Sequence, residues 1–195
     1  MNKRTLIIVF FIMAWANIAH SQETFYQRLA DSSLTLTKQN VHYDPSYYSI
    51  DYPNGDIPDG KGVCTDVIIR AYRKMGIDLQ KEVHEDMKAN FDKYPQLWGL
   101  RSTDQNIDHR RVPNLMTFYE RKGEVKTITR NAKDYLPGDI VCWDLGGGIT
   151  HIGIVVNRKS ADHTRYLIVH NIGEGQVVED CLFDFQLIGH YRYKK

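Results

Sequence analysis

The stretch Thr150-His151-Ile152-Gly153-Ile154-Val155-Val156 decides the fold class of this chain. It is short, rich in β-branched residues and headed by a histidine, and it predicts a buried strand. Residues 140–143 and 166–170 have the same character, and shorter strands are expected at 124–129, 176–179 and 189–193. The second half of the chain is therefore expected to form a small antiparallel sheet.

The first half of the chain has helical periodicity instead. Apolar residues recur with helical spacing from Val63 to Met75, and Gly76 follows where a left-handed C-cap is favoured. Residues 42–62 are expected to form a loop, because proline, glycine and aspartate interrupt them. Further helices are expected at about residues 25–38, 83–91 and 113–123. Helices followed by strands predict an α+β fold, with the helices packed on one face of the sheet.

Residues 1–21 have the pattern of a secretory signal peptide. Lys3-Arg4 precedes an apolar run over residues 6–18, and residues 19–21 offer a small-x-small cleavage site. The apolar run is shorter than the ~20 residues that a spanning helix needs. We therefore expect residues 22–195 to form a single periplasmic or secreted domain with no membrane anchor.

The charge balance excludes one large class of partners. The chain carries 25 basic and 24 acidic residues, and the formal charge becomes −1 once Lys3 and Arg4 leave with the signal peptide. A nucleic-acid-binding surface needs an excess of basic residues that this sequence lacks. Nothing in the charge favours adsorption to an anionic membrane either.

Cys64 is the candidate nucleophile because it opens the strongest predicted helix. The free amides and partial positive charge of a helix N-terminus favour a thiolate. The alternative is a buried structural cysteine. The chain has three cysteines, so at least one thiol stays unpaired in an oxidising compartment, and a Cys142–Cys181 disulfide is conceivable.

Two histidines at strand ends complete a possible triad with Cys64. We expect His151 to point to the sheet face covered by the Cys64 helix and to accept the thiol proton. His170 ends the next strand and is the candidate to hold the other nitrogen of the His151 ring, with Asn171 as the alternative. Such a mechanism requires no cofactor.

Three blocks of this sequence resemble those of known enzymes: Gly62-Val63-Cys64-Thr65-Asp66-Val67, Pro137-Gly138-Asp139-Ile140 and Thr150-His151-Ile152-Gly153-Ile154-Val155. They are similar to the cysteine, "PGD" and histidine blocks of NlpC-type and CHAP-type papain-like cysteine peptidases. The resemblance implies a papain-like fold, with Cys64 as nucleophile, His151 as base and His170 as its orienting partner. It also implies hydrolysis of amide bonds in peptidoglycan peptides.

A narrower resemblance covers nearly all of residues 22–195. The segments Tyr52-Pro53 to Pro58, Asn106 to Val112 and Gly189 to Tyr193 resemble an exported bacterial family catalogued as domain of unknown function 1287. That name assigns no substrate. It strengthens the expected fold and site more than the expected reaction.

Candidate substrate-binding residues lie in two polar segments. Asp66 stands where the related peptidases have a small residue, and it either caps the loop or opposes the thiolate. Residues 106–111 form either a solvated loop or a wall in which Arg110 or Arg111 clamps a carboxylate. The residues that we predict to contact substrate are Tyr52, Asp66, His109 and Arg110.

Other functions remain possible on the sequence alone. A zinc hydrolase would use His151 and His170 with His109 or Asp139, although no HExxH or paired CxxC pattern is present. A non-catalytic cell-wall-binding domain and an acyltransferase with the same nucleophile are further alternatives. The expected partner is peptidoglycan or a peptide, and the sequence does not predict the oligomeric state.

Overall fold

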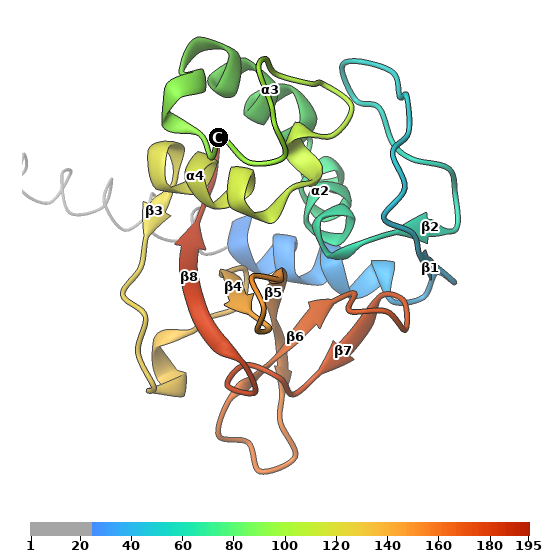
Figure 1. Cartoon of the computed structure of the whole chain (residues 1–195). Helices are drawn as coiled ribbons and strands as arrows, with labels where there is room; N and C mark the ends of the chain where they lie inside the picture. The colour runs from blue at the N-terminus through green and yellow to red at the C-terminus, as the bar shows by residue number, and fades with distance from the viewer. Residues whose placement is uncertain (1–24) are drawn as a thin grey trace, which may run out of the picture.

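The structure is a computed structural model that describes residues 25–195, so the predicted signal peptide lies outside the described residues. A helix over residues 25–36, α2 (Cys64–Lys74), α3 (Leu79–Ala89) and α4 (Val112–Lys122) lie together on one side of the sheet (Figure 1). The predicted helical regions are confirmed. Over residues 25–195, no helix combines the length and apolar character needed to cross a membrane.

Short elements connect the helices. Two-residue strands β1 (His42–Tyr43) and β2 (Lys61–Gly62) pair in parallel and bracket the segment that leads into α2. This pairing was not predicted, because residues 42–62 were expected to form only a loop. Single 3-10 turns are formed at η1 (Phe91–Lys93), η2 (Asp108–Arg110) and η3 (Ala132–Asp134).

The sheet consists of β3 (Glu124–Val125), β4 (Ile140–Asp144), β5 (Thr150–Lys159), β6 (Tyr166–His170), β7 (Val177–Glu179) and β8 (Gln186–Arg192). Its order is β3-β8-β4-β5-β6-β7, and every neighbouring pair is antiparallel. Strands β4 to β7 form the predicted meander, whereas β8 returns to lie between β3 and β4 (Figure 1). The helices and antiparallel sheet confirm the α+β class.

Both faces of the sheet are covered, by different parts of the chain. Cys142, Ile152 and Ile154 face the helices and join what we call the helical core. Val141, Trp143, Val155 and Ile168 point the other way and meet Tyr135, Cys181 and Leu182 from connecting segments, a group that we call the second cluster. Because successive strand residues point to opposite faces, two covered faces require the continuous apolar runs that the sequence shows.

The cysteines fall on different sides of this arrangement. Cys142 belongs to the helical core and Cys181 to the second cluster, so the sheet separates them. All three cysteines are free thiols, and the conceivable Cys142–Cys181 disulfide is not formed.

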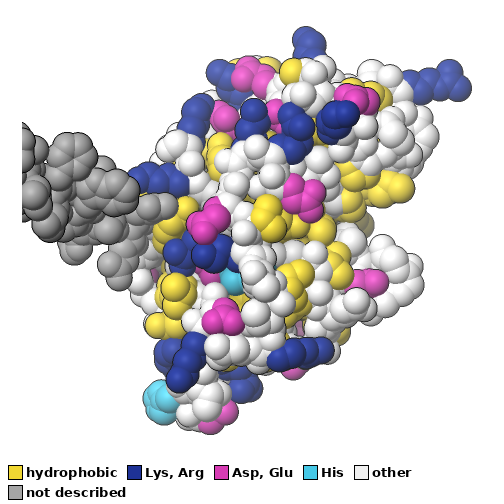
Figure 2. Space-filling model, turned by 90° about the vertical axis from the view of Figure 1, so that its left-hand side faces the viewer, with side chains coloured by type: hydrophobic (Ala, Val, Ile, Leu, Met, Phe, Trp, Pro, Cys, Tyr) yellow, Lys and Arg dark blue, Asp and Glu magenta, His cyan; other side chains and the backbone are white. Residues whose placement is uncertain are grey.

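Charges of both signs are mixed on the molecular surface. Figure 2 shows acidic and basic side chains interspersed on the face at the β3 side of the molecule. This distribution agrees with the near-zero formal charge and gives this face no basic stripe suited to nucleic acid.

Candidate functional site

Cys64 is the first residue of α2 and is 6% exposed. Burial, together with the charge of Asp66, raises the pKa of its thiol to about 12. The backbone amides of Ile152, Thr65 and Cys64 itself act in the opposite direction. The helix N-terminus therefore favours the thiolate as predicted, but burial outweighs it and the resting thiol stays protonated.

The N-terminus of α2 sits where two strands separate. Strands β5 and β6 pair from Ile154 and Val169 onward. Beyond that pair, the Asn171 Nδ2 donates to the Gly62 carbonyl at 3.2 Å, just ahead of α2. Together with the Ile152 amide at the Cys64 thiol, this contact places Cys64 at an edge of the sheet. Asn171 thus holds the approach to Cys64 and has no contact with His151 among the described hydrogen bonds.

His151 lies on the sheet face away from the helices, so the expectation that it points to the helical face is wrong. It pairs directly with Trp143, and the two rings stack with centroids 5.7 Å apart. Trp143 belongs to the second cluster, and Ile152 takes the inward position instead. Cys64 and the ring partner of His151 therefore belong to clusters on opposite faces of the sheet. Within residues 25–195, no hydrogen bond joins the Cys64 thiol to His151.

The predicted contact between the two histidines is present. His151 Nε2 lies 2.8 Å from His170 Nδ1, and His170 Nε2 lies 2.8 Å from Glu179 Oε2. The carboxylate can only accept, so His170 carries its proton on Nε2 and offers the Nδ1 lone pair to the His151 Nε2–H. This assignment, which follows from the network, leaves the lone pair of His151 on Nδ1.

Glu179 was missed by the sequence analysis. In the β6–β7 register His170 pairs with Val177, which puts Glu179 in the diagonal position two residues further on. A long side chain reaches across such a diagonal. Pairing the predicted strands 166–170 and 176–179 as a hairpin would have revealed the contact.

Gly153 makes room for this row of side chains. It shares the sheet face of His151, and a Cβ there would come within 2.6 Å of the Ile168 Cγ2 and 3.3 Å of the His170 Cβ. Any side chain at position 153 would therefore displace β6 or His170. The glycine lets His170 lie close enough to bind His151.

Both histidines are neutral at neutral pH. Burial, together with the neighbouring His170, lowers the pKa of His151 to about 3. Burial also lowers the pKa of His170, although the hydrogen bond that His170 donates to Glu179 opposes this effect. A neutral imidazole is the form that accepts a proton.

A cleft of about 440 Å³ opens beside Cys64. Its walls include Tyr43, Trp98, Arg111 and Thr150. This size suits a short peptide segment or a small molecule. The cleft joins the N-terminus of α2 to the segment before α4.

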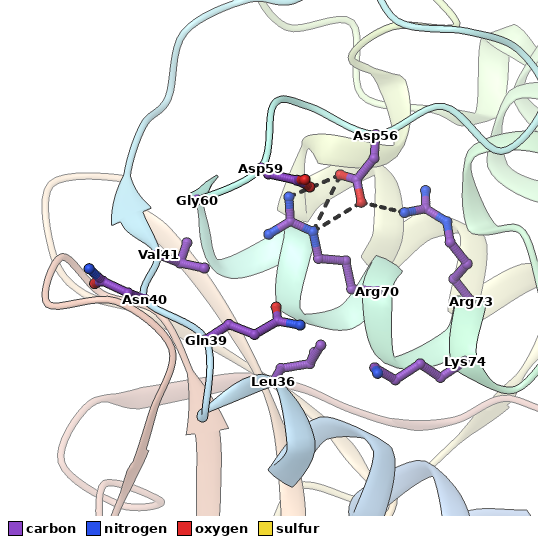
Figure 3. Close-up of a pocket in the computed structure, with 10 residues that line it drawn as sticks. All are labelled: Leu36, Gln39, Asn40, Val41, Asp56, Asp59, Gly60, Arg70, Arg73 and Lys74. Atoms are coloured by element: carbon purple, nitrogen blue, oxygen red, sulfur yellow. Dashed lines mark hydrogen bonds and ion pairs between the residues drawn. The ribbon is translucent and has the colours of Figure 1, made fainter.

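A larger cavity of about 520 Å³ lies elsewhere, between the end of the first helix and α2 (Figure 3). Figure 3 shows Asp56 between Arg70 and Arg73, and it binds both guanidinium groups. Neither Cys64 nor any histidine lines this cavity. The chemistry of the side chains therefore favours the smaller cleft at Cys64.

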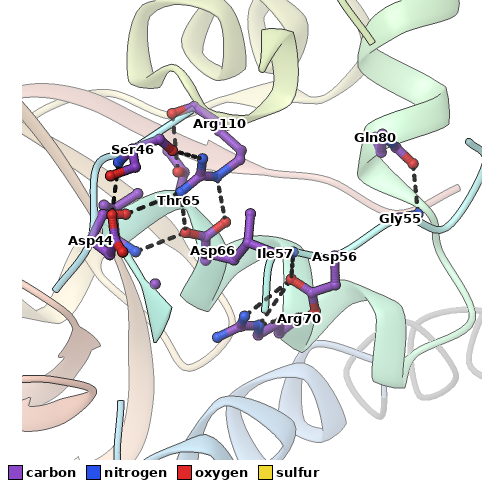
Figure 4. Close-up of polar contacts among 12 residues, drawn as sticks. Asp44, Ser46, Gly55, Asp56, Ile57, Thr65, Asp66, Arg70, Gln80 and Arg110 are labelled. Atoms are coloured by element: carbon purple, nitrogen blue, oxygen red, sulfur yellow. Dashed lines mark hydrogen bonds and ion pairs between the residues drawn. The ribbon is translucent and has the colours of Figure 1, made fainter. Parts of the chain in front are cut away.

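Asp66 and Arg110, two predicted substrate contacts, bind each other. The Arg110 Nε lies 3.0 Å from Asp66 Oδ1, and both side chains are 3% exposed (Figure 4). Asp66 also accepts the Val63 amide at 2.7 Å, so it caps α2, and Arg110 donates to the Ser46 carbonyl at 3.1 Å. The pair fastens the N-terminus of α2 to η2.

Tyr52 and His109 lie away from the cleft at Cys64. The Tyr52 ring packs edge-on against His84 of α3 with centroids 5.3 Å apart. His109 is buried, and burial, with the charges of Arg110 and Arg73, lowers its pKa to about 3. Neither residue lines the cleft.

The zinc ligands suggested from sequence are not brought together as a set. Asp139 is engaged by His190, at 2.7 Å, and by Arg192. Among the residues that the structure describes, the group that offers three ligand atoms within 4.8 Å of one another is His170, Glu179 and Cys181. This group shares His170 with the histidine pair.

Comparisons with known proteins agree with this fold. The chain belongs to the family described as Domain of unknown function (DUF1287), whose model matches residues 30–193. The uncharacterized protein YijF of Escherichia coli K12 is 48% identical over 165 residues, which cover 85% of this chain and 80% of that protein.

Two crystal structures of an N-acetylmuramoyl-L-alanine amidase from Bacteroides uniformis are similar in architecture. Their TM-scores are 0.51 and 0.50, with 12% and 13% identity. Each comparison covers 88% of this chain and all of the amidase chain. At this level of identity the likeness concerns the fold alone.

Proposed function

We propose that this protein is an exported cysteine amidohydrolase of papain-like, NlpC-type architecture that acts on peptidoglycan peptides. Cys64 is the nucleophile, His151 the base, and His170 with Glu179 the groups that orient it. One observation carries the proposal: the hydrogen-bonded row Glu179–His170–His151 ends one residue from the Ile152 amide that contacts the Cys64 thiol.

Cys64 and His151 come from different faces of the sheet, and the position of α2 explains how the two side chains can meet. Cys64 lies at the edge where β6 leaves β5, and His151 precedes the residue whose amide touches its thiol. The proposed proton transfer requires the Cys64 Sγ and the His151 Nδ1 to approach each other once substrate is bound. Catalytic hydrogen bonds are often long or misaligned before substrate binds.

The chemistry is general-base-assisted attack. As the Cys64 Sγ bonds to the carbonyl carbon of a peptide, its proton moves to the His151 Nδ1. The C–N bond then breaks, His151 returns the proton to the leaving amine, and water hydrolyses the thioester to restore the thiol. The Cys64 backbone amide at the helix N-terminus is placed to stabilise the oxyanion.

The structural likeness supports the reaction class. The name of the Bacteroides uniformis enzyme denotes hydrolysis of the amide bond in N-acetylmuramoyl-L-alanine. The signal-peptide pattern of residues 1–21 supports export from the cytoplasm. A peptidoglycan substrate lies outside the inner membrane, where the exported protein would meet it.

The test is incubation of the mature protein with purified peptidoglycan, followed by mass analysis of the released fragments. Hydrolysis adds one water across an amide, whereas acyl transfer leaves the acceptor on the product. Cys64→Ala should abolish release. Cys142→Ala is the matched control, because Cys142 lies in the helical core and should affect stability but not chemistry.

Two results would count against the proposal. Release by Cys64→Ala at the parent rate would remove Cys64 as nucleophile. Failure of the parent protein to release fragments from any peptidoglycan would favour the non-catalytic cell-wall-binding domain, which a sedimentation assay with the same peptidoglycan would detect.

A zinc hydrolase is the second candidate, favoured by the group His170, Glu179 and Cys181. The Cys181 Sγ lies 3.7 Å from the His170 Nε2, and imidazole, carboxylate and thiolate are all zinc ligands. The two functions differ in their response to a chelator. The cysteine mechanism predicts that hydrolysis survives chelation, and loss of activity that zinc restores would favour the metal.

A further inference from the structure

We infer that Arg111, stacked on Trp98 beside Cys64, forms a binding site for a carboxylate of the substrate. This inference deepens the proposed function and rests on it for the identity of the scissile bond. It assigns the substrate a free carboxylate close to the amide that is cut. The evidence comes from the different surroundings of the adjacent residues Arg110 and Arg111.

Arg110 also borders the cleft at Cys64, but most of its N–H donors are already bound within the protein. Its guanidinium binds both carboxylate oxygens of Asp66 and donates to the Ser46 carbonyl. The side chain is buried within this network. Its role is internal to the protein.

Arg111 lines the cleft that Cys64 also lines. Its Nη1 is buried and has no hydrogen-bond partner. A buried unpaired donor on a charged group costs free energy until a partner arrives. In the part of the chain from 25 to 195, no carboxylate forms an ion pair with Arg111.

The charges around Arg111 do not substitute for a ligand. Burial lowers the pKa of Arg111, while Asp108 and Asp104 oppose this effect from a distance. The Asp108 Oδ2 accepts from the Asp104 amide at 2.7 Å and lies 3.4 Å from the His84 Nδ1, whereas its Oδ1 has no hydrogen-bond partner within residues 25–195, and neither oxygen forms an ion pair with Arg111. The cation therefore faces the cleft without a counter-charge in contact.

Trp98 fixes the plane of the guanidinium. The Arg111 Cζ lies 4.2 Å from the centroid of the Trp98 ring, and the indole remains 54% exposed. Stacking of this kind holds a guanidinium in one orientation, and the Arg111 Nη1 remains unpaired among the described residues. A planar fork held in this way suits the two oxygens of a carboxylate.

Side-chain substitution at Arg111 should leave the fold intact. The Arg111 carbonyl accepts the Asn114 and Leu115 amides at the start of α4, and these bonds do not involve the side chain. Arg111→Gln therefore removes the charge and the fork while keeping the helix start. Arg158→Gln, at an exposed position on β5, is the matched control.

The experiment measures binding to the Cys64→Ala protein by calorimetry, so it does not depend on turnover. The probes are a synthetic peptide with a free carboxylate one residue from the amide to be cut, and its twin with a carboxamide there. We expect the acid to bind about ten- to a hundredfold more tightly than the amide. Arg111→Gln should abolish that preference, Arg111→Lys should retain part of it, and Arg158→Gln should retain all of it.

Each result decides the inference. Equal binding of the two peptides, absence of binding by both, or a preference that survives Arg111→Gln would overturn it. The expected binding pattern, combined with no hydrolysis by the protein with intact Cys64, would retain the carboxylate site and reject the proposed hydrolysis.

Discussion

At Cys64 two physical effects oppose each other. The amides at the start of α2 and at Ile152 stabilise negative charge on sulfur, whereas burial raises the pKa of the thiol to about 12. Burial also raises the pKa of Cys142 and Cys181. Access to the cleft, rather than resting ionisation, therefore distinguishes Cys64 from the other two.

This distinction predicts the order of thiol alkylation. Cys64 should react first with iodoacetamide, because it lines the cleft whereas Cys142 is fully buried. His151→Ala should slow the labelling of Cys64 by removing the proton acceptor. Peptide mapping by mass spectrometry at short reaction times gives the order. Labelling of Cys142 ahead of Cys64 would contradict the assignment of the nucleophile.

Glu179 is expected to set the tautomer of His170 and, through it, that of His151. Glu179→Gln should lower kcat by about tenfold with little change in KM, because orientation of the base is lost while the cleft is unchanged. Asp180→Asn is the matched control, since Asp180 pairs with Arg165 at the surface. Steady-state kinetics on a peptide substrate supplies the measurement. Equal kinetics of parent and Glu179→Gln would remove Glu179 from the site.

At the scale of elements, the buried pair Asp66–Arg110 holds α2 in place. The side chain of Val63, the residue before α2, cannot accept a hydrogen bond from the first turn of the helix. Asp66 caps the helix instead, because its carboxylate accepts the backbone amide of Val63. Arg110 comes from η2, and its carbonyl accepts the Thr65 hydroxyl at 3.1 Å. The element that presents Cys64 is thus fastened by residues that sequence analysis had assigned to substrate.

Breaking this pair should destabilise the protein strongly. Asp66→Asn or Arg110→Met leaves one buried charge unpaired, which costs about 3–5 kcal/mol in the free energy of unfolding. The double variant should lose less than the sum of the two, because neither charge remains. Urea denaturation measures all three, with Lys81→Ala as control because its pairing with Glu85 is exposed. Additive losses would show that the two side chains are not coupled.

At the scale of the whole molecule, three buried histidines connect stability to pH. Burial lowers the pKa of His109 and His151 to about 3 and also lowers that of His170. Between pH 6.5 and about 3 the unfolded chain binds protons at His109 and His151 that the folded chain does not. The free energy of unfolding therefore falls as pH falls through this window, by up to about 1.4 kcal/mol per pH unit for each histidine.

His109 tests this linkage without touching the cleft at Cys64. His109→Gln should reduce the slope of unfolding free energy against pH between 6 and 4 by the equivalent of about one bound proton. Urea denaturation at several pH values gives the slope. A slope equal to that of the parent would mean that His109 binds a proton equally in the folded and unfolded states.

The sequence by itself determined the helices, the strands and several chemical candidates. Helical spacing from Val63 to Met75 and the apolar runs at 140–143, 150–156 and 166–170 are local patterns, and the structure follows them. The contact between His151 and His170 was also predictable, because both residues stand at the ends of neighbouring strands.

Apart from the contact between His151 and His170, tertiary structure alone decided which side chains meet. The return of β8 beside β4, the face taken by His151, the diagonal contact of Glu179 and the choice between Arg110 and Arg111 all depend on long-range register and packing. A shift of one residue in strand register reverses the face of every side chain, and no local pattern around His151 fixes that register. Burial likewise outweighed the helix N-terminus at Cys64, because desolvation depends on everything that packs around the thiol.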